Sequence, residues 1–172
     1  MSCEITPSKA RLGLPLWHPA VLLATWFGVG LIPIAPGTWG SLAALPFAWA
    51  IHSLWGATGL AIAIAIVFFT GWWAAATVVK AGGIKDPRFL VIDEVAGQWL
   101  VLLAAPRDPL AWVLAFLLFR IFDIWKPWPV RWADRDIAGG LGVMLDDLLA
   151  AVYAALVLWV LLVIGGVFGV RS

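Results

Sequence analysis

The stretch ATGLAIAIAIVFFTGWWAAATVV, residues 57–79, carries no charged side chain. It is long enough to cross the hydrocarbon core of a bilayer as a helix, which takes roughly 20 apolar residues. Apolar and polar residues do not alternate with the period of two that the strands of a membrane barrel require. The stretch therefore predicts a transmembrane α-helix, and with it a helical membrane protein.

The whole chain has the composition of a membrane protein. Of its 172 residues, 63% are hydrophobic and 12% are charged, and the mean hydropathy is +1.00, whereas about a quarter of a soluble domain is charged. Further apolar runs lie at residues 20–32, 41–55, 90–105, 109–122 and 146–169. Because prolines bound the short first run, we expect an interfacial or re-entrant helix there.

The predicted fold class is all-α: a polytopic integral membrane bundle with four to five transmembrane helices and this N-terminal interfacial or re-entrant helix. No linker or composition shift divides the chain, so we expect a single domain over residues 1–172. Residues 1–16 form its polar N-terminal tail. No small-residue cleavage site follows the basic residues of the tail, so we expect an uncleaved start.

The basic residues divide unequally between the two predicted membrane faces. If the segment before residue 41 is cytoplasmic, nine of the 11 basic residues share its side: Lys9, Arg11, Lys80, Lys85, Arg88, Arg120, Lys126, Arg131 and Arg135. Only Arg107 and Arg171 fall on the other side. Because cytoplasmic loops keep an excess of Lys and Arg, the N-terminus is predicted to face the cytoplasm.

Charge and cysteine content argue against two classes of function. The net charge is only +1, whereas a nucleic-acid-binding surface needs a concentrated excess of Lys and Arg. The single cysteine, Cys3, lies in the polar tail, so it forms no internal disulfide and is a poor candidate for a phosphatase nucleophile. We expect no nucleic-acid partner, and no protein partner is inferable.

Acidic residues gather on the same predicted face as the basic ones. Eight of the ten lie in two loops or at adjoining helix ends: Asp86, Asp93, Glu94, Asp123, Asp134, Asp136, Asp146 and Asp147. Ionisable groups beside membrane segments are usually functional. A solvated loop accounts better for Asp134 and Asp136, while the others abut apolar runs and are candidates for chemistry.

Carboxylates from three helix ends suit magnesium, which prefers oxygen ligands and often takes only one or two carboxylates. The candidates for one or two metal ions are Asp93 with Glu94, Asp123, and Asp146 with Asp147. Adjacent acids point about 100° apart on a helix. We therefore expect one member of each doublet to ligate directly and the other to orient a water or cap a helix.

Arg120, Asp123 and Lys126 are spaced at i, i+3 and i+6, which aligns them on one face if the helix persists. Pro127 is then expected to end the helix. Cations beside a metal-binding aspartate are suitable partners for phosphate oxygens. Salt bridges with a structural role are the alternative.

The segment PIAPGTWGS, residues 33–41, precedes a helical run. Gly37 and Gly40 permit close approach of the backbone, and Thr38 and Ser41 are candidates to cap the helix or to donate to an anion at its positive end. A plain turn with a capping side chain fits equally well. The predicted location on the acidic face is what favours a role in binding.

Four blocks of this chain together resemble the phosphatidylglycerophosphatase A family of bacterial membrane enzymes. They are LIPIAPGTWGSLAALPF, DPRFLVIDEVAGQW, FRIFDIWKPWPVRWADR and GGLGVMLDDLLAAVYA, and they extend in the family's order over most of the chain. Ala151 stands where the family's pattern leads us to expect glycine. Neither residue carries a functional group, so this departure concerns helix packing more than chemistry.

The resemblance implies magnesium-dependent hydrolysis of phosphatidylglycerophosphate to phosphatidylglycerol and inorganic phosphate at the inner membrane of a bacterium. The candidate catalytic residues are Asp93, Glu94, Asp123, Lys126, Asp146 and Asp147. All of these except Lys126 are candidate metal ligands. The candidate substrate-binding residues are Gly37, Thr38, Gly40, Ser41, Arg120 and Lys126. The expected partner is a phospholipid substrate whose acyl chains stay in the bilayer.

Two questions of mechanism and class stay open at this point. Direct attack by a metal-activated water is preferred over a covalent aspartyl-phosphate, because the D-x-D-x-T pattern of aspartate-nucleophile phosphatases is absent. A lipid phosphotransferase and a small transporter are the alternative functions. The charges cluster at one interface, whereas transporters place them near the midplane.

Overall fold

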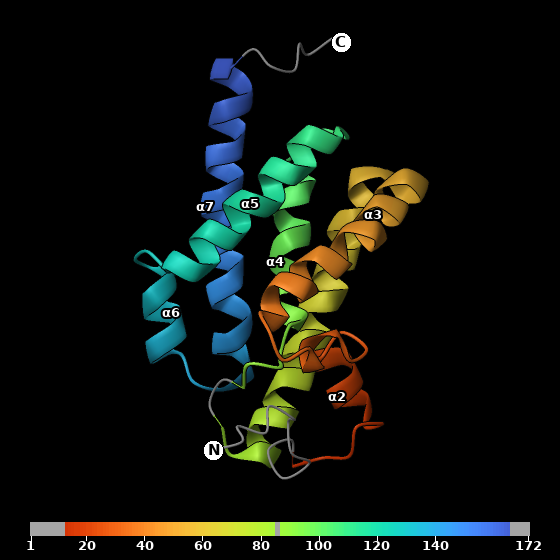
Figure 1. Cartoon of the computed structure of the whole chain (residues 1–172), viewed down its shortest axis with the longest axis vertical. Helices are drawn as coiled ribbons and strands as arrows, with labels where there is room; N and C mark the ends of the chain where they lie inside the picture. The colour runs from red at the N-terminus through yellow and green to blue at the C-terminus, as the bar shows by residue number, and fades with distance from the viewer. Residues whose placement is uncertain (1–12, 85–86, 166–172) are drawn as a thin grey trace.

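The computed structural model describes residues 13–84 and 87–165, and every regular element in these ranges is helical. The elements, shown in Figure 1, are α2 (Pro19–Ala24), the 3₁₀ helix η1 (Val29–Leu31), α3 (Pro36–Gly82), α4 (Ile92–Leu103), α5 (Pro109–Trp125), α6 (Val130–Asp136) and α7 (Gly139–Gly165). The prediction of an all-α fold is confirmed. Most of the predicted polar tail and Lys85, Asp86 and Arg171 lie outside the described residues.

Helix α3 contains both of the helices expected at 41–55 and 57–79, joined at Gly56. Gly56 has φ 67° and ψ −165°, a conformation open to glycine because it lacks a Cβ. In Figure 1 the segment before Gly56 (orange) and the segment after it (yellow) run in opposite directions. One residue therefore replaces the loop of a helical hairpin.

The start of α3 differs from the expectation. The helix begins at Pro36, and neither Thr38 nor Ser41 caps it with a side chain. Proline is favoured in the first turn because its φ is already helical and its missing N–H has no partner there in any case. The Ser41 hydroxyl donates instead to the carbonyl of Gly37 at 2.9 Å. Of the two alternatives for Thr38 and Ser41, capping of this helix is therefore wrong, and donation to an anion stays a prediction.

Helix α4 forms the centre of the molecule, packed against α3, α5 and α7. Nearly all of its side chains are buried. Close packing depends on Gly97, where a Cβ would press into the ring of Phe119 and approach the backbone of Asp147. The Trp99 indole donates to the carbonyl of Ala44 at 2.9 Å, which ties α4 to α3. The acids in the first turn of α4 are thus held by the most enclosed element.

The outer faces of α3, α5 and α7 are apolar. Large exposed hydrophobic side chains include Ile62, Ile66, Phe69, Val113, Leu117, Ile121, Leu156, Trp159 and Val163. Soluble monomers rarely expose such continuous apolar surface. Two helices, α3 and residues 139–164 of α7, are long and apolar enough to cross a membrane, with mean hydropathies of 2.1 and 2.5. These features indicate membrane association.

The other apolar runs that were predicted to span the membrane correspond to shorter helices in the structure. Helix α4 has 12 residues and α5 has 17, fewer than the roughly 20 that cross a bilayer. The first apolar run is divided into α2 and η1, with α2 packed on the last part of α3. The number of spans and the interfacial position of the first run stay predictions.

Candidate active site

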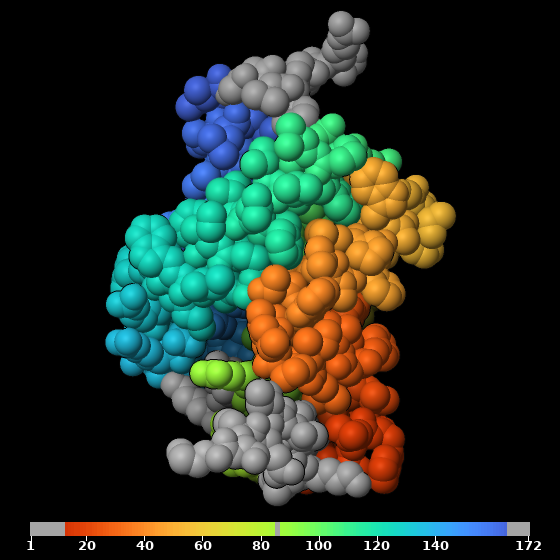
Figure 2. All heavy atoms as spheres, in the orientation of Figure 1, coloured from red at the N-terminus to blue at the C-terminus, as the bar shows by residue number. Residues whose placement is uncertain are grey.

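The charged helix ends converge on one pocket of about 680 Å³. Figure 2 shows the surface hollowed between α6 (cyan) and the first turns of α3 (orange). The pocket is lined by six carboxyl and three cationic side chains: Asp93, Glu94, Asp123, Asp134, Asp146, Asp147, Arg88, Arg120 and Lys126. All five acids singled out in the sequence are therefore brought together, with a formal excess of three negative charges over the lining residues.

Asp93, Glu94 and Asp147 form the tightest acidic group. One carboxylate oxygen from each lies within 4.8 Å of the others, close enough for all three to contact a single metal ion. Oε2 of Glu94 and Oδ2 of Asp147 are buried and accept no hydrogen bond from any described residue. Buried carboxylate oxygens without donors are costly, and a bound cation relieves that cost. The donor set consists of oxygens, which fits a hard divalent cation.

The two acidic doublets differ in geometry. Asp147 joins the group, while its neighbour Asp146 accepts a hydrogen bond from Lys126 at 2.6 Å; one direct ligand per doublet stays a prediction. Asp93 and Glu94 both contribute an oxygen to the group. Their side chains reach the same space because the cavity lies at the end of α4, so adjacent faces of its first turn border it. No side chain caps α4.

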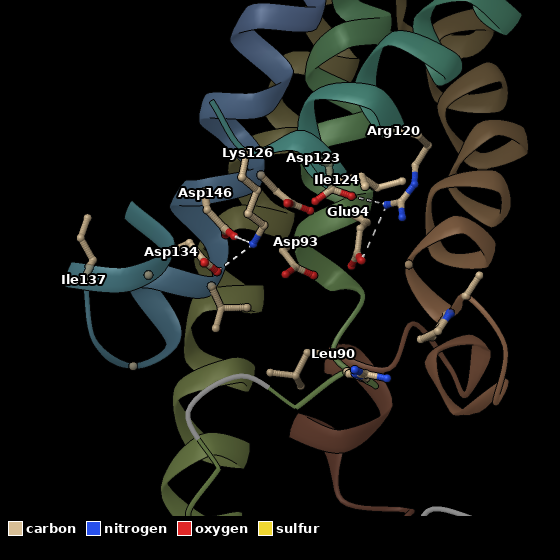
Figure 3. Close-up of a pocket in the computed structure, with 18 residues that line it drawn as sticks. Leu90, Asp93, Glu94, Arg120, Asp123, Ile124, Lys126, Asp134, Ile137 and Asp146 are labelled. Atoms are coloured by element: carbon tan, nitrogen blue, oxygen red, sulfur yellow. Dashed lines mark hydrogen bonds and ion pairs between the residues drawn. The ribbon is translucent and has the colours of Figure 1, made fainter. Parts of the chain in front are cut away.

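Arg120 and Asp123 form the predicted pair on one face of α5. Nη1 of Arg120 lies 2.5 Å from Oδ2 of Asp123 and 3.9 Å from Oε1 of Glu94. Figure 3 shows the guanidinium pointing across the pocket toward both carboxylates. Arg120 therefore connects α5 to the acidic group on α4.

Lys126 does not lie on that face. Helix α5 ends at Trp125, and Lys126 adopts a left-handed conformation with φ 47°. The following Pro127 disfavours the α conformation at this position, which accounts for the early end. Lys126 donates to Asp134 at 2.7 Å and to Asp146 at 2.6 Å, as Figure 3 shows. Alignment of Lys126 with Asp123 was expected only if the helix persisted to Lys126, and α5 ends one residue before it.

The surroundings of Lys126 keep it charged. Burial lowers the pKa of Lys126, but the carboxylates of Asp146 and Asp134 together raise it more. The net result is a pKa above the ordinary value for lysine. The ammonium group is therefore a fixed positive charge on the wall of the pocket at neutral pH.

Comparison with known proteins bears on what such a pocket does. The sequence model of the family described as Phosphatidylglycerophosphatase A matches residues 22–162. The chain belongs to the phosphatidylglycerophosphatase A family. No solved structure matches it.

Three relatives illustrate the similarity. Phosphatidylglycerophosphatase A of Escherichia coli is 41% identical over 164 residues, which cover 91% of this chain and 88% of that protein. The protein of the same name from Haemophilus influenzae is 42% identical over 156 residues, 90% and 96% of the two chains. A Bacteroides thetaiotaomicron protein, provisionally named a phosphatidylinositol-3-phosphatase, is 45% identical over 141 residues, 78% and 87% of the two chains.

In this phosphatidylglycerophosphatase A family member, the segment of residues 33–41 contributes less to the pocket than expected. Gly37 lines the pocket, whereas Thr38, Gly40 and Ser41 are not among its lining residues. A Cβ at Gly37 would overlap Oε1 of Glu94, while one at Gly40 would press against Val91. Gly37 therefore makes room for the acidic group, and Gly40 makes room for packing between helices.

Two pocket residues were not selected from the sequence. Asp134 was assigned to a solvated loop, yet it accepts a hydrogen bond from Lys126. Arg88 was interpreted as a residue that orients the protein or attracts anionic lipid head groups, not as a site residue; it lines the pocket, and no described residue forms an ion pair with it. The position of Arg88 five residues before the acidic pair was the available signal for it.

Proposed function

We propose that this protein is a multi-pass membrane phosphatase that hydrolyses the terminal phosphate of phosphatidylglycerophosphate, with magnesium held by Asp93, Glu94 and Asp147. The observation that carries the proposal is the buried group of three carboxylates beside Arg120 in an open pocket. The family to which the chain belongs supplies the class of reaction. The product alcohol is phosphatidylglycerol, and the product anion is inorganic phosphate.

The negative excess of the pocket supports the metal in this proposal. Six carboxyl groups against three cationic groups make the cavity unfavourable for an anionic phosphate, and a bound cation would offset that negative excess. Asp93, Glu94 and Asp147 would hold the ion, with Asp123 and Asp146 at its edge. When bound, magnesium would polarise the phosphoryl oxygens and make a coordinated water more acidic.

Each of the three cationic side chains has its own role in binding the terminal phosphate. Arg120 faces Glu94 and Asp123 and is placed to contact oxygens of a phosphate bound beside them. Arg88 is the pocket cation without an ion pair among the described residues, so it is the one most available to the incoming anion. Lys126, held by Asp134 and Asp146, supplies a fixed charge on the opposite wall.

The proposed reaction is an in-line displacement by water. The water oxygen forms a bond to phosphorus while the bond from phosphorus to the glycerol oxygen breaks. A carboxylate of the pocket accepts a proton from the water, and the glycerol oxygen gains a proton as it leaves. Asp123 as a covalent nucleophile is disfavoured because Arg120 engages its carboxylate at 2.5 Å.

We also propose that the pocket faces the cytoplasm. Among the described residues, Arg107 and Asp108 lie in the connection between α4 and α5, at the end of the molecule opposite α6 in Figure 1. The other described acidic residues and most basic ones lie on helix ends and loops near α6 and the pocket. Excess positive charge marks the cytoplasmic side.

The test is release of inorganic phosphate from phosphatidylglycerophosphate by the detergent-purified protein. We expect release that depends on magnesium, is lost with excess chelator, and falls at least a hundredfold in Asp123→Asn. Phosphatidylinositol 3-phosphate serves as a competing substrate, because one relative bears that name. Absence of release from folded protein with magnesium would overturn the proposal, and preference for the inositol lipid would change its substrate.

Replacing Arg88 with glutamine is expected to lower kcat/KM on the order of tenfold, because a charge-assisted contact to phosphate is lost. The control is Lys80→Gln, which removes a positive charge from the last turn of α3 without touching the pocket. Both variants are assayed in the same micelles. Equal effects of the two substitutions would show that Arg88 acts only through the general field of the surface.

A further inference from the structure

A second hollow, also of about 680 Å³, lies at the corner between α5 and α6. Lys126 lines both this hollow and the acidic pocket, so the two cavities adjoin at that side chain. Helix α6 lies at the edge of the molecule in Figure 1, where its outer side has no protein neighbour in view. The established family activity assigns no role to this second hollow.

The charge of the second hollow is opposite to that of the pocket. Its lining contains Lys126, Arg131 and Arg135, with Asp136 as the only carboxylate among the lining residues described. Arg131 is exposed, and no described residue forms an ion pair with it. This corner therefore suits an anionic group that needs no metal ion.

Three tryptophans complete the lining. Trp125 is 64% exposed, Trp128 is 79% exposed and Trp132 is 49% exposed. Large amphipathic rings exposed together at one end of a membrane protein are suited to the layer of lipid head groups. The hollow thus combines guanidinium groups with aromatic surface, a combination suited to the head-group layer that contains the phosphates of phospholipids.

We propose that this hollow is the subsite for the phosphodiester of the substrate lipid, with Arg131 as its main contact. The inference rests on the proposed function. Phosphatidylglycerophosphate carries two phosphates separated by one glycerol unit: the terminal monoester, which is cleaved, and the diester that leads to the acyl chains. The acidic pocket, which suits a metal ion, would take the terminal monoester. The adjoining basic hollow would take the diester.

The arrangement assigns a different role to each arginine. Arg88 lines the acidic pocket and acts on the terminal phosphate, whereas Arg131 lines only the second hollow. Lys126 lies between the two phosphates and is placed to contact either. Arg131 is therefore a specificity residue, since it contributes only when the substrate has a diester.

The test compares two lipids with the same acyl chains. Phosphatidylglycerophosphate has both phosphates, while phosphatidic acid has a terminal monoester and no diester. Arg131→Gln is expected to lower kcat/KM about tenfold for the first lipid, mainly through KM, and to leave the second unchanged. Arg88→Gln is expected to lower both, and Lys80→Gln neither. Equal losses for both lipids, or no loss, in Arg131→Gln would overturn the proposal.

A binding measurement separates this inference from the proposed function. Short-chain phosphatidylglycerol, which keeps the diester but lacks the terminal phosphate, is titrated into wild type and Arg131→Gln in neutral detergent. We expect about tenfold weaker binding to the variant. If wild type hydrolyses neither lipid but still binds phosphatidylglycerol about ten times more tightly than Arg131→Gln, the phosphatase proposal is overturned and the subsite is supported. If binding is equal, the subsite falls whatever the turnover.

Discussion

Replacing Asp147 with asparagine is expected to abolish phosphate release and, at the same time, to stabilise the metal-free protein. Asp147 is 3% exposed and lies within the group formed with Asp93 and Glu94. Loss of one ligand should reduce kcat/KM a hundredfold or more, because changes outside the ligand shell already cost roughly 10–100-fold. Without metal, an amide in place of one of three crowded carboxyl groups removes part of the free-energy cost of burying them side by side.

Thermal unfolding with and without magnesium separates these two effects. Binding to the folded state alone stabilises by about 2.7 kcal/mol when the ligand is at roughly a hundred times its Kd. Wild type should show such a shift in Tm, and Asp147→Asn should lose it while its metal-free Tm rises. A variant that keeps both full activity and the magnesium shift would show that the three carboxylates do not hold the ion.

The matched control is Asp108→Asn. Asp108 caps α5 at the other end of the molecule, where its Oδ1 accepts from the backbone N–H groups of Leu110 and Ala111. Asparagine is as good a helix N-cap as aspartate. The same chemical change should therefore leave turnover, Tm and the magnesium shift close to those of wild type.

Replacing Gly37 with alanine is expected to reduce activity by at least tenfold without loss of stability. The new Cβ would overlap Oε1 of Glu94 and stand 3.2 Å from Nη1 of Arg120. Glu94 must then move away from the acidic group, which would weaken the proposed binding of magnesium. Alanine itself favours the helix by roughly 1 kcal/mol relative to glycine. The defect should therefore appear in the magnesium concentration needed for half-maximal rate.

Gly40→Ala is the matched control for Gly37→Ala, because Gly40 lies three residues further along the same helix. Its Cβ would stand 2.7 Å from Cβ of Val91, in the apolar core and away from the pocket. We expect a lower Tm and an unchanged magnesium requirement for the molecules that fold. If Gly37→Ala also lowered Tm and left the magnesium requirement unchanged, Gly37 would be a packing residue.

Local features of the sequence predicted local structure well. The helix positions followed from long apolar runs, and the pairing of Arg120 with Asp123 followed from a spacing of three residues on one helix. The convergence of Asp93, Glu94 and Asp147 was also anticipated, because all three lie at the ends of apolar runs on one predicted face. Family membership then favours the phosphatase over the phosphotransferase and the transporter.

Features that depend on one backbone conformation or on distant packing were not predictable in the same way. The partners of Lys126 follow from its left-handed conformation and from the placement of α6, so a helical spacing rule misassigned them. Which residue of the segment 33–41 faces the pocket depends on where α3 begins. A start at Pro36 turns Gly37 toward Glu94 and directs the Ser41 hydroxyl to its own helix.

The bend at Gly56 also sets the length of each apolar arm of α3. A straight helix of the 47 residues of α3 would be about 70 Å long at 1.5 Å per residue, more than twice the roughly 30 Å of hydrocarbon. Because the chain reverses at Gly56, the arms 36–55 and 57–82 are instead about 30 Å and about 40 Å long. Each arm by itself is therefore about as long as the hydrocarbon is thick.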